Sequence, residues 1–109
     1  MKLDRNGLGG VGKYALVNLR KLTKMQLSGA DMSGVSEALD ILLGKGLLEM
    51  GSPGSKDEFF VLKLKDLNST AALRAYARTA RISDAEFSDE VMELAARSGS
   101  NHPHCKLPD

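Results

Sequence analysis

The strongest constraint on the fold is a pair of helical patterns near the C-terminus, separated by only about three residues. The first pattern predicts a helix that Asn68 or Ser69 caps and that runs to about Arg81. Its expected buried residues are Leu73, Tyr76, Ala77 and Ala80.

The second pattern begins at Ser83, because a serine followed three positions later by Glu86 is the capping-box arrangement. Gly99 is the expected stop. The expected buried residues of this helix are Phe87, Val91, Leu94 and Ala95. Since the connection is short, we expect the two helices to pack as an antiparallel helical hairpin.

Two further helices are expected in the first half of the chain. One is capped by Ser33 or Ser36 and ends at the glycines 44 and 46. The period of residues 13–22 is ambiguous between helix and strand, and a helix over residues 12–23 is the preferred interpretation.

A β-hairpin is predicted between these helical regions. Residues 47–50 and 59–65 are the expected strands, and the turn-rich residues 51–58 form its tip. The predicted fold class is therefore α+β, a small single domain with this hairpin and three or four helices. The glycine-rich segment 1–12 is expected to be flexible, residues 13–99 to be globular, and residues 100–109 to form an irregular tail.

The composition restricts the class of protein. A chain of 109 residues with 42% hydrophobic positions fits one globular domain and leaves little room for a large cofactor cleft. One cysteine excludes an internal disulfide, and no run of eighteen apolar residues predicts a membrane span. We therefore expect a cytoplasmic protein without a cofactor and without a membrane partner.

The net charge of +1 hides a segregated distribution. Residues 1–26 carry six basic groups and one acidic group, whereas residues 27–66 carry four basic and seven acidic groups. Residues 67–83 carry three arginines and no acid, and residues 84–109 carry two basic and six acidic groups. Blocks of alternating sign can neutralise one another in the fold or present separate charged faces to partners.

A glycine motif in the first segment resembles a phosphate-binding loop. Gly7, Gly9 and Gly12 match G-x-G-x-x-G, and the window that ends at Lys13 matches most of a P-loop. Both motifs require a buried strand before them, and only six residues, MKLDRN, precede Gly7, which is too short and polar a segment for such a strand. Tyr14 also stands where the P-loop needs a hydroxyl ligand for magnesium. We therefore expect no cofactor site here.

The C-terminal tail contains His102, His104 and Cys105, which are potential zinc ligands. A structural zinc site needs four donors, and the chain has no other histidine or cysteine. Cysteine catalysis needs an activating base held by a third group, which a proline-rich tail does not position well. We therefore predict no metal site and no catalytic residue.

Two charge stripes lie on the predicted helical hairpin. An acidic stripe at i, i+3, i+4 and i+7 comprises Glu86, Asp89, Glu90 and Glu93. A basic stripe on the preceding helix comprises Arg74, Arg78 and Arg81. The stripes are either solvated faces or binding surfaces for a charged partner.

The order helix, strand, tip and strand after Ser33 suggests an alternative, the second half of a winged-helix domain. Its reading helix would present Glu37 and Asp40 to phosphates, which argues against groove reading. The basic residues that a nucleic-acid-binding regulator would use are Lys13, Arg20, Lys21, Lys24, Arg74, Arg78 and Arg81.

Four segments resemble a group of small phage- and prophage-encoded proteins. They are GKYALVNLRKL at 12–22, DEFFVLKLKD at 57–66, ALRAYA at 72–77 and NHPHCKLPD at 101–109. The resemblance implies a host-cytoplasm setting and an accessory protein that modulates another macromolecule, and it transfers no site residue.

The sequence thus predicts a non-enzymatic phage-type accessory protein that binds a host or phage protein through a charged helical face. The acidic stripe is the preferred binding surface, and nucleic-acid binding through the basic residues is the alternative. A large exposed apolar patch on the face of the predicted β-hairpin would instead indicate a homodimer.

Overall fold

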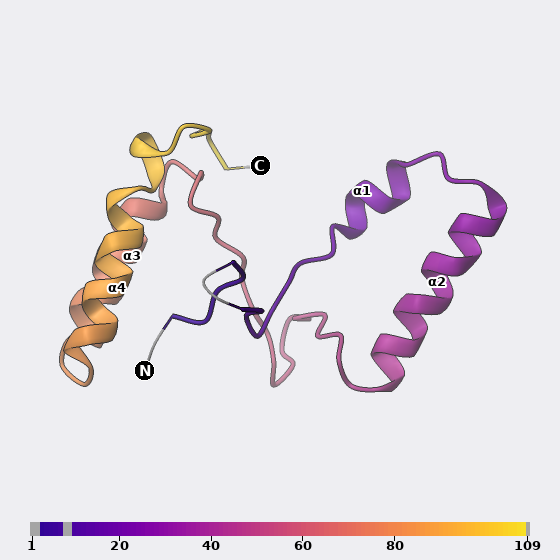
Figure 1. The fold of residues 1–109 in the computed structure, drawn as a ribbon, viewed down its shortest axis with the longest axis horizontal. Coiled ribbons are helices and arrows are strands. Elements are labelled where there is room, and N and C mark those ends of the chain that lie inside the picture. The colour runs from indigo at the N-terminus through magenta and orange to yellow at the C-terminus, as the bar shows by residue number, and fades with distance from the viewer. Residues whose placement is uncertain (1–2, 8–9, 109) are drawn as a thin grey trace. The chain divides into compact units, whose positions relative to one another are not determined.

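The computed structural model describes residues 3–7 and 10–108 of the chain. Within this part the chain forms four α-helices and one short 3-10 helix (Figure 1). In chain order they are α1 (Leu19–Lys24), α2 (Gly29–Gly44), α3 (Ser69–Ala80), α4 (Ala85–Ala96) and η1 (Gly99–Asn101).

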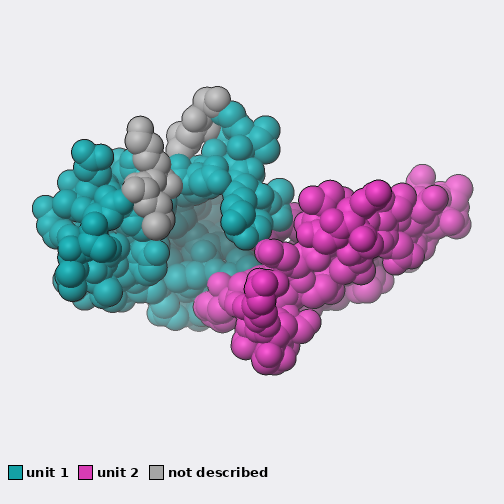
Figure 2. Space-filling view, turned by 90° about the horizontal axis from the view of Figure 1, so that it is seen from below, with its two compact units in different colours: residues 1–15, 61–109 teal, residues 16–60 magenta. Residues whose placement is uncertain are grey.

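The chain divides into two compact units, which Figure 2 shows in different colours. Unit 1 comprises residues 1–15 and 61–109 and contains α3, α4 and η1. Unit 2 comprises residues 16–60 and contains α1 and α2.

The core of unit 1 lies between α3 and α4, which form a helical hairpin. Its buried centre is Ala77, Phe87 and Val91, and Leu3, Leu73 and Ala80 pack against it. The ring of Tyr76 on α3 meets that of Phe87 edge to face, with the centroids 6.1 Å apart. The hydroxyl of the buried Ser88 donates to the carbonyl of Ala77 at 2.7 Å, which joins the two helices directly.

At the other end of unit 1, a buried set of hydrogen bonds joins the start of α3 to η1, and we call this set the junction. Ser69 donates from its hydroxyl to the carbonyls of Leu64 and Asp66 at 2.9 and 2.7 Å. The backbone N–H of Gly99 donates to the Leu64 carbonyl at 2.8 Å and to the Ser69 hydroxyl oxygen at 3.1 Å. Every buried side-chain polar atom in the described part of the chain has a hydrogen-bond partner, so the junction carries no unpaired group.

Unit 2 has local structure but no buried core. Asn18 caps α1 by accepting from the N–H of Lys21 at 2.8 Å, and Ser28 caps α2 by accepting from the N–H of Asp31 at 3.1 Å. All of its residues, 16–60, are described, and each is at least partly exposed. Caps and helical hydrogen bonds therefore define this unit more than burial does.

The predicted α+β fold is wrong, because residues 47–50 and 59–65 do not pair as strands. The β pairing in the described part of the chain is one isolated bridge between Asp66 and Lys106. The segment 60–64 follows the expected alternation only in part, because Leu62 and Leu64 are half-buried whereas Phe60 is 87% exposed. Backbone groups at its end bond to the C-terminal tail, since the N–H of Lys106 donates to the carbonyl of Lys65 at 2.9 Å.

Several predicted boundaries also differ. A helix over residues 12–23 is wrong for its first half, because α1 begins only at Leu19 after the cap at Asn18. Helix α2 begins at Gly29, earlier than the Ser33 or Ser36 cap predicts. Asp84 rather than Ser83 caps α4, and its carboxylate accepts from the N–H of Phe87 at 3.0 Å.

Of the glycine-rich segment 1–12, residues 1, 2, 8 and 9 lie outside the described residues. Around them, the Asn6 carboxamide closes a loop by accepting from the N–H of Gly12 at 2.7 Å and donating to the carbonyl of Tyr14 at 3.0 Å. This loop leads into extended chain rather than into a helix.

Candidate functional site

The acidic stripe lies on α4, which contributes most of the buried residues of unit 1. Because Phe87, Val91 and Leu94 are buried on one side of α4, the helix must turn its other side to solvent. At 100° per residue, Glu86, Asp89 and Glu93 fall within about 60° of one another on that side. All three are exposed.

Two of the four predicted carboxylates accept hydrogen bonds from other residues of the chain. Asp89 accepts a hydrogen bond from the Arg81 guanidinium at 2.8 Å, so one member of the basic stripe pairs with one member of the acidic stripe. Glu90 is half-buried and accepts from the backbone N–H of Leu3 at 2.8 Å. Glu90 therefore anchors the N-terminal segment of its own chain.

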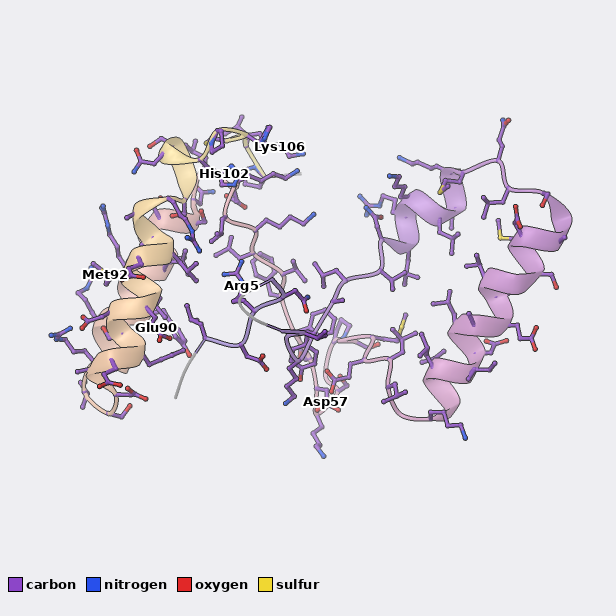
Figure 3. The ribbon with its side chains drawn as sticks, viewed as in Figure 1. Arg5, Asp57, Glu90, Met92, His102 and Lys106 are labelled. Atoms are coloured by element: carbon purple, nitrogen blue, oxygen red, sulfur yellow. The ribbon has the colours of Figure 1, made fainter. Side chains whose placement is uncertain are left out.

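The other two carboxylates, Glu86 and Glu93, point to solvent and have no side-chain hydrogen bond or ion pair within the described residues. Met92, labelled on α4 in Figure 3, lies three positions after Asp89 and is 41% exposed. Ala96 is exposed one helical turn after Met92. The surface is thus acidic on one side and apolar on the other.

We call this surface the α4 face and define it by Glu86, Asp89, Met92, Glu93 and Ala96. Met92 and Ala96 are not part of the predicted site, because that prediction follows charge alone. The spacing i, i+3 from Asp89 to Met92 is the signal in the sequence that could have included the methionine.

The residues of the predicted basic surface are divided between the two units. Arg74 and Arg78 are exposed one turn apart on α3, and within the described residues their side chains have no partner. The ammonium group of Lys13 lies 5.2 Å from the centroid of the Tyr14 ring. The remaining members of the predicted set, Arg20, Lys21 and Lys24, lie on α1, in the other unit.

The C-terminal histidines and cysteine are arranged for local structure. The Nδ1 atom of His102 accepts from the backbone N–H of His104 at 3.0 Å, and the N–H of Cys105 donates to the carbonyl of His102 at 3.1 Å. Among residues 3–7 and 10–108, no group of three His, Cys, Asp or Glu side chains is placed to hold a metal ion.

Comparisons with protein-family models, with curated proteins and with solved structures find no match to this chain. In the described part of the chain, no helix combines the length and the apolar character that crossing a membrane requires.

Proposed function

We propose that the chain is a non-enzymatic binding protein that uses the α4 face to hold a basic segment of another protein. The observation that supports this most is the state of Glu86 and Glu93, which are exposed, unpaired within the described residues and fixed on a helix with a buried core. The resemblance to small phage-encoded proteins adds a setting to this proposal, a cytoplasmic accessory protein that modulates its partner.

The charge that a partner meets at the α4 face can differ from the net charge of the whole chain, because salt screens distant charges. Seven residues of helix separate Glu86 from Glu93, a rise of about 10 Å. Since the Debye length at physiological ionic strength is about 8 Å, a ligand at this helix senses mainly the nearby charges, which are the carboxylates of Glu86, Asp89 and Glu93 together with the Arg81 guanidinium that pairs with Asp89. Local charge can therefore attract a cationic segment although the net charge is +1.

The face also restricts the chemistry of the partner. Carboxylates at i, i+3 and i+7 match lysines or arginines at the same spacing on a second helix, and Met92 offers an apolar contact beside them. A partner helix with a basic stripe next to one or two apolar residues fits this surface best.

A capture experiment from the producing cell tests the proposal. The tagged wild-type chain, an E86K/E93K variant and an E37K/D40K variant serve as baits, because both variants change the charge equally but the second changes α2 instead. We expect E86K/E93K to recover a specific protein at least about tenfold less, at roughly 0.5–1 kcal/mol per exposed charge pair, and E37K/D40K to recover it normally. Far-UV circular dichroism confirms that each variant is folded, and E86Q/E93Q provides a milder second variant.

Equal recovery by wild type and E86K/E93K would refute the proposal, as would equal loss with both double variants. Nucleic-acid binding is the competing outcome, although the predicted wing does not form within the described residues. A labelled duplex at low salt tests it. Binding that falls steeply with salt and is lost in R74E/R78E would replace protein binding as the function.

A further inference from the structure

Helix α2 carries an apolar stripe that the chain buries only in part. The stripe runs at the 3-4-3 spacing of a helix-pairing seam, with one further apolar residue at its edge. Its members are Met32, Val35, Leu39, Leu42 and Leu43. The first four are half-buried and Leu43 is exposed.

Neither of the other sides of α2 provides a core. Helix α1 does not pack along α2, although both belong to unit 2. Ile41 lies on the opposite side of α2 from the stripe and is 54% exposed. A helix with apolar residues on more than one side is typical of one that is covered by other helices.

We propose that a second copy of this chain covers the stripe, with the two α2 helices antiparallel about a two-fold axis. In this register Met32 packs against Leu42 of the second copy, and Val35 packs against Leu39 of the second copy. The symmetry repeats both contacts, so the pair has four apolar layers along a helix of about 24 Å.

Charge complementarity selects this arrangement. In the antiparallel register the residues that flank the seam on one side are Asp31, Ala38 and Lys45. Asp31 of each copy then faces Lys45 of the other, and the two Ala38 residues meet at the axis. Within the described residues neither Asp31 nor Lys45 has a side-chain partner in its own chain.

On the other side of the seam, the facing residues fit in this register without a steric clash or a like-charge contact. It brings Leu43 against Gly29 of the second copy, where the missing side chain leaves room, and Ser36 against Ser36. The remaining acids of α2, Glu37 and Asp40, lie away from the seam. A parallel pair would instead place Asp31 beside Ser36 and leave Lys45 without a charge partner, so the antiparallel register is the one that the sequence of α2 supports.

This association uses unit 2, whereas the proposed binding function uses α4 in unit 1. It therefore does not depend on the α4 face, and E86K/E93K should leave it unchanged.

A charge-swap series on the full-length chain tests the pairing by sedimentation velocity between about 1 and 200 μM. In D31K both flanking contacts become lysine against lysine, and in K45D both become aspartate against aspartate. Because two attractive exposed contacts become repulsive, each single variant should dimerise at least about tenfold more weakly. E37K is the matched control for D31K, because it makes the same charge change away from the seam.

The decisive sample is an equimolar mixture of D31K and K45D. Only in the antiparallel pair does the lysine introduced in one chain meet the aspartate introduced in the other, while the unchanged Lys45 meets the unchanged Asp31. The mixture should therefore regain wild-type dimerisation.

A wild-type chain that stays monomeric up to about 200 μM would overturn the proposal. A dimer that D31K and E37K weaken equally, or that mixing does not restore, would overturn the antiparallel register and with it the proposal.

Discussion

A methyl group added at Gly99 should destabilise unit 1 more than any other conservative change near the tail. Gly99 is buried and has a φ of +58°, in the left-handed region that side chains rarely adopt. A β-carbon there would overlap the Thr70 hydroxyl oxygen and lie 3.1 Å from the carbonyl oxygen of Leu67. Thr70 cannot turn away without cost, because its hydroxyl hydrogen-bonds that of Ser98 at 2.9 Å.

Two contributions determine how far Gly99→Ala lowers the free energy of unfolding. The left-handed backbone costs a residue with a β-carbon about 1–2 kcal/mol, and overpacking of a filled site costs about 1–3 kcal/mol. We therefore expect the free energy of unfolding of unit 1 to fall by about 2–5 kcal/mol. Replacing Thr70 by Ala in the same chain removes the overlapping atom, so the double variant should recover part of the loss.

Urea unfolding followed by tyrosine fluorescence measures this effect. The chain has two tyrosines and no tryptophan, so a Tyr14→Phe background leaves Tyr76 on α3 as the reporter of unit 1. Gly34→Ala is the matched control, since nothing lies within 4 Å of a β-carbon at that position. A Gly99→Ala midpoint that coincides with the control would refute the claim that the junction is tightly packed.

Two further predictions concern the helical hairpin. Phe87→Ala should lower the free energy of unfolding by about 3–5 kcal/mol, because Phe87 is only 9% exposed. Phe60 is 87% exposed, so Phe60→Ala should change the free energy of unfolding by less than about 0.5 kcal/mol. Similar urea midpoints for the two variants would contradict this prediction. Arg81→Ala should cost less than about 1 kcal/mol, because its ion pair with Asp89 is exposed, and the cost should shrink in about 1 M salt; a larger, salt-independent loss in thermal unfolding would show that Arg81 acts through packing.

The sequence was sufficient to predict the helical hairpin because the signals for it are local. Apolar residues at helical spacing and a short connection act within one helix or between neighbours, and α3 and α4 lie where they indicate. The β-hairpin was wrong because alternation does not show which backbone groups bond to each other, and the exposure of Phe60 shows that it does not fix which side chains are buried either. The carbonyl of Leu64 accepts from Gly99, some thirty-five residues away, and no periodicity in the sequence encodes that choice.

The candidate site was predictable only in part, for a similar reason. Spacing alone places Glu86 and Glu93 on one side of α4, and the structure agrees. Spacing cannot show that the Glu90 carboxylate accepts a hydrogen bond from the backbone N–H of Leu3, because these two residues are far apart in the sequence. The sequence also does not show that the basic residues belong to two different units, because the composition does not change at the unit boundary near residue 16.

The two proposed surfaces should respond oppositely to salt, because different forces act on them. Attraction of a basic segment to Glu86, Asp89 and Glu93 is electrostatic at exposed positions, so added salt screens it. Pairing of the α2 stripes depends mainly on burial of apolar side chains, which salts such as sulfate strengthen. Salt also screens the flanking contacts of Asp31 and Lys45, but these exposed ion pairs contribute less to the association than the apolar layers do. Salt therefore separates the two associations without any substitution, with the α4 complex dissociating under conditions in which the α2 pair persists.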